Sequence, residues 1–286
     1  MKYLLRLSII ISAILSNLIF SQISQAYVLS LTNSGDSTYW YTHCIPFWLS
    51  TTGAESLDRN IVERDLIDSL RAWDNVECTA LSFTYEGEID SSFIGYDINE
   101  NAENHNLLTF VSPPQSWLYD PSVLALTTVT MCVNDTPDCA VGTIIDADIE
   151  INEQGYQFTT SEAQRVQMDL ANTITHELGH FLGIDHSNVV EATMYFQQNL
   201  GETNKRDLAD DDQNALCSIF PMDDDRVCTL DAYQFGVMPD ETQGDTNRTP
   251  PANEGCQQAQ NFGIILNLFS LGLLIMLFRT RYSDRH

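Results

Sequence analysis

Apolar residues recur at helical spacing in three segments of the chain. In residues 57–73, Leu66 and Leu70 stand four positions apart on an apolar stripe, as in a helix that packs on a core. A longer stretch with this spacing covers residues 162–182, and a short one covers residues 209–220. The pattern therefore predicts three helices, of which the second is long.

Other segments alternate between apolar and polar residues, or are rich in Val, Ile and Thr, which is typical of strands. We expect strands at residues 45–50, 81–85, 93–98, 107–111, 123–131 and 142–152. No internal repeat is visible in the sequence. The order of helix, several strands, long helix and short helix predicts one α+β domain over residues 27–221.

The N-terminal residues have the order of a secretory signal peptide. Lys2 and Arg6 give a basic start, residues 7–20 are mostly apolar, and Ala26 offers a small residue for cleavage. The alternative is a buried N-terminal helix, which this order disfavours. We therefore expect residues 1–26 to be a signal peptide and the protein to be exported.

A second apolar run, residues 262–278, directly precedes Arg279 and Arg281. It is at the lower length limit for a membrane span, and the basic flank predicts that the C-terminal end stays inside. Together with the preceding Cys256, this tail resembles the C-terminal sorting tails of bacterial surface proteins. Residues 261–286 are therefore expected to be a transmembrane anchor or a sorting tail, with a buried core helix as the third alternative.

Composition and charge exclude one class of partner. Residues 222–260 are polar and contain several Pro, Gly and Asp residues, which is typical of a linker. The chain has 13 Lys and Arg against 40 Asp and Glu, a formal net charge of −27 at pH 7. Such a surface repels phosphate backbones, so we expect no nucleic-acid partner. We expect the protein to be a monomer.

The chain has seven cysteines, and export allows them to form disulfides. Six of them precede the odd one, Cys256, and many connectivities are open to six cysteines. The pairs that we expect are Cys132–Cys139, Cys217–Cys228 and, as the remainder, Cys44–Cys78. Paired C-x-x-C spacing is missing from the sequence, which argues against a zinc site made of cysteines.

The segment from His176 to His186 carries the strongest chemical signal. His176 and His180 are four residues apart, so on a helix they share one face and can both reach one metal ion. Glu177 points elsewhere and can approach the metal's water without being a ligand. Gly183 can end the helix, after which the chain turns and His186 can supply a third ligand. Three protein ligands leave one position for water, the arrangement of a catalytic zinc site.

These residues resemble the long zinc signature of the metzincin metallopeptidases. Residues 192–195, Ala-Thr-Met-Tyr, are similar to the Met-turn of that family, at the spacing of the matrixin branch. Residues 208–216 resemble the C-terminal helix of matrixins, whose paired aspartates would be Asp211 and Asp212. The resemblance implies a zincin-like fold: a mixed twisted sheet with an edge strand for substrate, a long active-site helix and a short C-terminal helix.

The resemblance also implies how substrate and metals are bound. Residues 124–130 would form the edge strand that holds an extended peptide, and zinc would be the catalytic metal. Phe196 stands where the family has a proline, so the wall of the specificity pocket differs. Family members often carry structural calcium, for which residues 210–212 and 223–225 are candidates; a solvated face or helix capping is the favoured alternative for these acidic runs.

The function expected from the sequence is a secreted or surface-anchored zinc endopeptidase acting on proteins or peptides. His176, His180 and His186 would hold the zinc, whose bound water would lose its proton to Glu177 as general base. One alternative is a catalytically silent, zinc-containing adhesion or binding module on the cell surface. Another is a zinc hydrolase that acts on a non-peptide amide.

Overall fold

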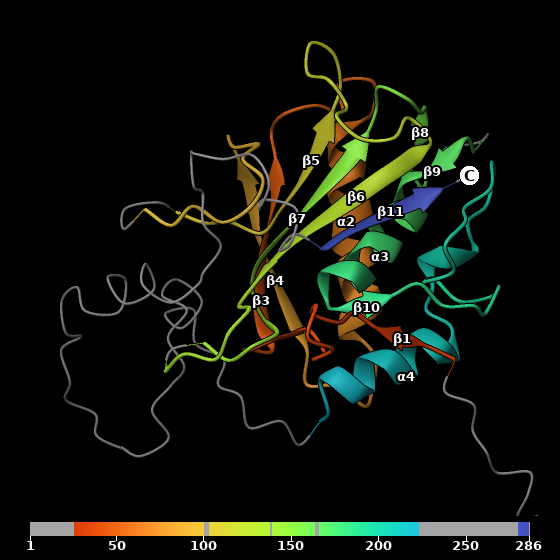
Figure 1. Cartoon of the computed structure of the whole chain (residues 1–286). Helices are drawn as coiled ribbons and strands as arrows, with labels where there is room; N and C mark the ends of the chain where they lie inside the picture. The colour runs from red at the N-terminus through yellow and green to blue at the C-terminus, as the bar shows by residue number, and fades with distance from the viewer. Residues whose placement is uncertain (1–25, 100–102, 138, 164–165, 223–279, 286) are drawn as a thin grey trace, which may run out of the picture.

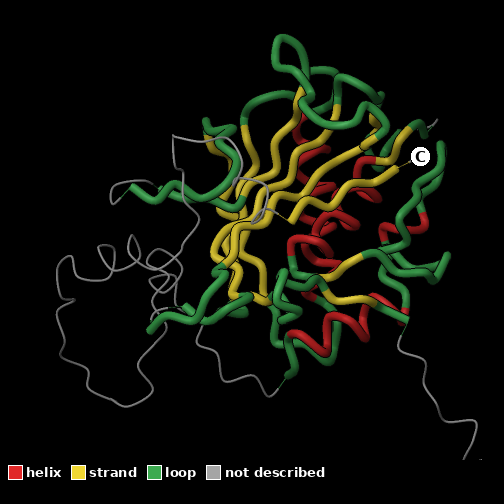
Figure 2. The backbone as a smooth tube through the Cα atoms, viewed as in Figure 1, coloured by secondary structure: helices red, strands yellow, loops and turns green. Residues whose placement is uncertain are grey.

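The computed structural model describes residues 26–222, apart from 100–102, 138 and 164–165, and again residues 280–285. Its centre is a seven-stranded sheet in the order β11-β6-β7-β5-β3-β4, with β2 paired to β7 (Figures 1 and 2). The strands are β2 (Tyr39–Trp40), β3 (Cys44–Ser50), β4 (Ser82–Ile89), β5 (Leu107–Val111), β6 (Val123–Met131), β7 (Thr143–Asn152) and β11 (Thr280–Arg285).

The sheet is mixed, as the resemblance to the metzincins implies. β3, β4, β5 and β7 are paired in parallel, β2 is parallel to β7, and β6 runs antiparallel to β7. The parallel pair β3 and β4 is joined by the helix α2 (Arg59–Asp74), because parallel neighbours need a crossover connection. β6 and β7 are buried along their whole length, since each has a paired strand on both sides and α3 packs against them.

Three α-helices and a 3₁₀ turn accompany the sheet in the described part of the chain. They are α2, α3 (Leu170–Phe181), η1 (Asn204–Arg206) and α4 (Asp210–Ile219). α2 and α3 pack together, and the indole N–H of Trp73 donates to the carbonyl of Thr175 at 3.0 Å. Phe181 at the end of α3 stacks on Trp40 with ring centroids 5.0 Å apart, which fixes α3 on the apolar face of the sheet (Figure 1).

Two short strand pairs lie outside the main sheet. β1 (Val28–Leu29) pairs antiparallel with β10 (Ile184–Asp185), directly after α3. β8 (Phe158–Thr159) pairs in parallel with β9 (Met168–Asp169), directly before α3. Both ends of α3 are therefore tied to other parts of the chain, although the sequence pattern predicts neither pair.

The second predicted helix is shorter than expected. The apolar pattern indicates residues 162–182, whereas α3 begins at Leu170. Asp169 has extended backbone angles and its carboxylate accepts a hydrogen bond from the Asn172 N–H at 2.9 Å, so it is the N-cap that starts the helix. The strand pairing of β9 with β8 holds the preceding residues in an extended conformation, which excludes a longer helix.

The strand expected at residues 93–98 is wrong, because this segment is a loop. Phe93 and Ile98 are 56% and 43% exposed, so their alternation does not reflect a buried face. Gly95 has a φ of +92°, and its N–H donates to the carboxylate of Asp148 on β7 at 2.6 Å. The segment is therefore held by a side chain of the sheet rather than by strand pairing.

The disulfides agree with the expected pairing in part. Cys132–Cys139 is confirmed and closes the turn between β6 and β7. Cys217 is bonded to Cys78, so the expected pairs Cys217–Cys228 and Cys44–Cys78 are wrong. The reason is spatial: Thr79, next to Cys78, bridges to Pro221 and brings the start of β4 beside the end of α4. Cys44 is also disulfide-bonded.

Most of the segments expected to be a signal peptide and a linker, and the apolar part of the tail, lie outside the described residues. Within the described residues, no helix is long and apolar enough to cross a membrane. The last residues of the tail, β11, pair antiparallel with the outer edge of β6 (Figure 1). The expected edge strand β6 therefore has a neighbour on both sides.

Candidate metal centre

The structure brings together the three histidines that the sequence singles out. His176 and His180 project from the same face of α3, and His186 follows β10. Their candidate ligand atoms all lie within 4.8 Å of one another, and the Nε2 atoms of His180 and His186 are 3.2 Å apart. Among the described residues, these histidines form the one group of three or more His, Cys, Asp or Glu side chains that is arranged to hold a metal ion.

The chemistry of these donors fits zinc. The Nδ1 atoms of His176 and His180 lie 2.6 and 2.8 Å from the carbonyl oxygens of Thr193 and Ile184. Carbonyl oxygens only accept, so Nδ1 carries the hydrogen in both rings and Nε2 keeps its lone pair for a metal. Such a hydrogen bond on the far ring nitrogen is typical of histidines that bind zinc, because it fixes tautomer and ring orientation.

A sharp turn after α3 brings His186 close to the other two histidines. Gly183 has a φ of +95°, and a Cβ there would lie 2.7 Å from the carbonyl oxygen of Thr38. Its own carbonyl accepts from the Ser30 N–H at 2.9 Å. The side chain of Asp185 then accepts from the His186 N–H at 2.7 Å. The tight turn therefore requires glycine, and the N-terminal segment of the domain holds it in place.

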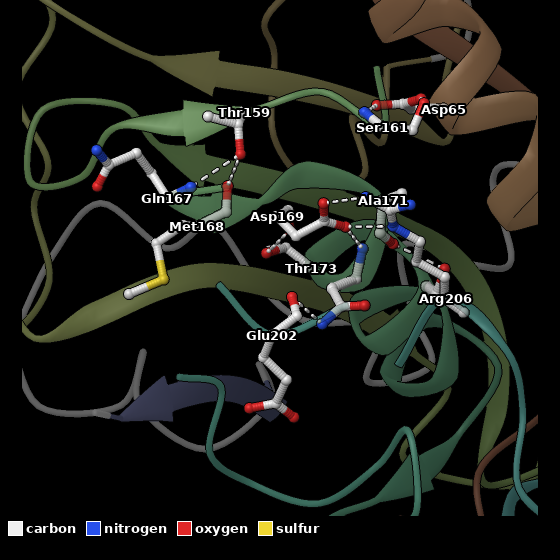
Figure 3. A network of polar contacts seen from close by, with 12 residues as sticks. Asp65, Thr159, Ser161, Gln167, Met168, Asp169, Ala171, Thr173, Glu202 and Arg206 are labelled. Atoms are coloured by element: carbon white, nitrogen blue, oxygen red, sulfur yellow. Dashed lines mark hydrogen bonds and ion pairs between the residues drawn. The ribbon is translucent and has the colours of Figure 1, made fainter. Parts of the chain in front are cut away.

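A polar network fixes the start of α3, as Figure 3 shows. The buried carboxylate of Asp169 caps the helix. It also forms a bidentate ion pair with Arg206 of η1, in which Nε and Oδ1 are 2.8 Å apart. The hydrogen bond to Asp169 raises the pKa of the Arg206 guanidinium. Thr173 donates to the carbonyl of Asp169 at 2.9 Å, and Asn172 donates to that of Glu202. The segment that contains Glu202 and Arg206 is thereby tied to the start of α3.

Met194 lies directly beneath the metal-site helix. It is 1% exposed, and a Cβ placed on Gly179 of α3 would lie 2.1 Å from its sulfur. The same Cβ would lie 3.1 Å from Cζ2 of Trp73 on α2. The helix can approach Met194 this closely only because residue 179, which lies between two of the three histidines, has no side chain.

The paired aspartates of α4 hold the loop that contains Met194. Asp212 is buried and accepts from the main-chain N–H groups of Thr193, Met194 and Ala209 at 2.7–2.9 Å. Burial raises the pKa of Asp212, while these hydrogen bonds act in the opposite direction. Asp211 accepts from the Ser187 hydroxyl at 2.6 Å. Both carboxylates thus accept hydrogen bonds from protein donors, and the bond from the Ala209 N–H makes Asp212 a capping residue of α4.

Glu177 is fully buried and faces the sheet. Its Oε2 atom accepts from the hydroxyl of Thr127 on β6 at 2.6 Å. Sequence reasoning singled out Glu177 but missed Thr127, Asp169 and Arg206. The N-cap position of Asp169 could have been predicted, because aspartate is favoured at helix N-caps. The contact of Thr127 could not, because Thr127 is one of several threonines in a strand.

Comparison with known proteins supports one family. A family model described as Matrixin matches residues 136–221, which is less than a third of the chain. The match contains all three histidines, Glu177 and the paired aspartates. This stretch supports a matrixin-like metallopeptidase domain. No curated protein matches the chain.

The mixed sheet and the three helices of the domain are compatible with a metzincin-like fold. A matrixin domain implies zinc and protein or peptide substrates, and the histidine cluster is able to bind such a metal. Matrixins are typically extracellular, and the disulfides Cys78–Cys217 and Cys132–Cys139 fit an exported protein.

Proposed function

We propose that residues 27–221 form a zinc-dependent endopeptidase. The observation that carries this proposal is the convergence of three imidazoles, two with Nδ1 engaged by carbonyls, beside the buried carboxylate of Glu177. A purely structural zinc site has no need of a carboxylate next to its ligands, and it commonly has four protein ligands rather than three. His176, His180 and His186 would be the ligands.

The proposed chemistry divides the work between the metal, which activates water and the scissile carbonyl, and the protein, which carries out the proton transfers. A bound zinc ion supplies a water of lowered pKa and polarises the scissile carbonyl. Glu177 takes the proton from the attacking water and delivers it to the leaving amine, as general base and then general acid. Its buried position keeps the carboxylate away from bulk solvent, which strengthens its interactions with the reacting groups.

The substrate would bind as an extended strand on the outer edge of β6, residues 124–130. Peptide strands add to a sheet edge through main-chain hydrogen bonds. β6 is the last strand of the domain itself, and β11 of the tail pairs with its outer edge, so a substrate would take the place of β11. Phe196 is 42% exposed and its ring centroid lies 6.4 Å from that of His186, so it would contact substrate side chains near the scissile bond.

The test is cleavage of a mixed peptide library by the full chain, purified without metal and then given zinc. We expect cleavage that a chelator abolishes and zinc restores. Glu177→Gln should bind one zinc per chain but lose about 100-fold or more in kcat, because general base catalysis contributes at least this factor. The exposed Glu191 offers the control, and Glu191→Gln should cleave like the parent.

Each alternative has its own outcome in this experiment. A silent binding module would bind zinc and cleave no peptide in the library. An amidase for other substrates would also leave the library intact, but it would release amine from small amides in a zinc-dependent way. Unchanged cleavage by Glu177→Gln would show that the proposed mechanism is wrong.

We further propose that the protein is exported, with residues 1–26 as the signal peptide and residues 261–286 as a membrane anchor or sorting tail. Support comes from the order of residues at both ends and from the disulfides of the domain. Mass spectrometry of the protein from its native host would test both assignments, because it measures where the mature chain begins and ends.

A further inference from the structure

Thr127 connects the sheet to the carboxylate that the proposed mechanism uses. It lies in the middle of β6, is fully buried, and faces α3. Its hydroxyl lies 2.6 Å from Oε2 of Glu177 and 3.1 Å from the carbonyl oxygen of the same residue. One hydroxyl therefore lies between the main chain and the side chain of Glu177.

This geometry restricts the side chain of Glu177. A glutamate side chain has three rotatable bonds, and a short hydrogen bond from a hydroxyl to a carboxylate is among the stronger ones in proteins. Thr127 itself is stiff, because β-branched residues have few χ1 rotamers in a strand. A rigid donor bonded to Oε2 holds that oxygen toward the sheet and thereby restricts the orientation of the whole carboxylate.

Thr127 also belongs to the strand on which the substrate would pair. Its main chain is in register with Ile149 of β7 on one side and with Tyr282 of β11 on the other, so a substrate would pair here in place of β11. The same residue thus fixes the general base through its side chain while its backbone forms part of the peptide-binding edge. Thr127 would therefore determine where the carboxylate of Glu177 lies relative to a peptide paired with β6.

We propose that Thr127 is a positioning residue that holds the carboxylate of Glu177 in the orientation needed for proton transfer. The inference rests on the proposed function, since it gives a role to a contact of the proposed general base. It predicts an effect on turnover rather than on peptide binding, because the hydroxyl makes no contact that a substrate would replace.

The experiment compares three variants of the full chain. Thr127→Val keeps the shape of the side chain but removes the hydroxyl, and Thr127→Ser keeps the hydroxyl. Thr109→Val is the matched control, because Thr109 on β5 is also buried and its hydroxyl has no hydrogen-bond partner among the described residues. All three are measured for zinc content, kcat and KM on a peptide that the parent cleaves.

Thr127→Val should lose about 10-fold or more in kcat, with KM within about twofold and zinc content unchanged, as expected when a hydrogen bond to a charged group is lost in the transition state. Thr127→Ser should recover most of this loss, and Thr109→Val should match the parent. A crystal structure of metal-free Thr127→Val should show Glu177 in more than one rotamer.

Two results would overturn the inference. One is a Thr127→Val protein whose kcat stays within about twofold of the parent; the other is a Thr127→Ser protein that is as impaired as Thr127→Val. A single, unchanged Glu177 rotamer in the metal-free variant would also contradict it, without relying on activity. Failure of the proposed function is distinguishable, because the parent itself would then cleave no peptide.

Discussion

At the scale of single residues, the arrangement of the histidine cluster depends on the absence of a side chain at Gly179. This residue lies on α3 between His176 and His180, above the sulfur of Met194. A methyl group there would overlap the sulfur at 2.1 Å and press against Trp73. Since Met194 and Trp73 are buried, neither can move into solvent, and the strain would pass to the helix that carries the histidines.

We predict that Gly179→Ala destabilises the protein by about 1–3 kcal/mol, the usual cost of overpacking a core, although alanine favours a helix more than glycine does. It should also weaken zinc binding, because α3 must shift. Denaturant unfolding and a zinc titration measure the two effects. The double variant Gly179→Ala/Met194→Ala relieves the overlap and should lose less stability than the sum of the single variants; additive losses would contradict the explanation.

Single residues also show which parts of the candidate site can be predicted from the sequence. His176 and His180 are visible because helical periodicity alone places them on one face, and a glycine before His186 indicates the turn. The partners of this motif are distant in sequence: Thr127 contacts Glu177 across 50 residues, and Arg206 pairs with Asp169 across 37. Such pairs arise from tertiary packing, for which local spacing gives no signal.

At the scale of elements, the junction between α2 and β4 contains a half-buried carboxylate. Asp74 ends α2 and accepts from the Phe83 N–H of β4 at 2.8 Å. Burial raises the pKa of Asp74 from 3.8 to about 6, although the hydrogen bond acts in the opposite direction. The folded protein thus holds this proton more tightly than the unfolded chain. Between about pH 4 and pH 6 the group therefore lowers the free energy of unfolding as pH rises.

We predict that Asp74→Asn stabilises the protein relative to the parent at pH 7 but not at pH 4. Asparagine keeps an oxygen that accepts from the Phe83 N–H, and it has no charge to desolvate. Urea unfolding at the two pH values gives the comparison. Glu77→Gln, at an exposed side chain three residues after Asp74, is the control and should change stability equally at both. A gain for Asp74→Asn that is the same at pH 4 and pH 7 would contradict the assignment.

Elements were predictable where burial and periodicity agree. The strands β5, β6 and β7 and the helix α2 are long, regular and packed on one core, so their sequences carry the pattern. The loop at residues 93–98 alternates by chance, since its apolar side chains are largely exposed. The start of α3 was misplaced because strand pairing of β9, a tertiary contact, overrides a continuous apolar pattern.

At the scale of the whole molecule, the tail occupies the sheet edge on which a substrate is proposed to bind. β11 pairs antiparallel with β6, with Tyr282 in register with Thr127, and this is where the proposed function places a peptide (Figure 1). One edge has a single row of main-chain groups, so residues 280–285 and a substrate cannot both pair with it. A membrane-spanning segment 262–278 would also exclude this pairing, because it would place the tail on the far side of the membrane.

We predict that the double variant Tyr282→Pro/Ser283→Pro lowers the KM for peptides and leaves kcat unchanged. In an antiparallel pair, alternate residues direct their N–H groups to the neighbouring strand, so two adjacent prolines remove a donor whichever register position bonds. Tyr282→Ala/Ser283→Ala is the control and should keep the parent KM, since its backbone can still pair. A synthetic peptide of residues 280–285 should inhibit the proline variant competitively, while a scrambled peptide should not. If the proline and alanine variants share the KM of the parent, β11 does not compete with substrate, and the tail is free to serve as the proposed anchor.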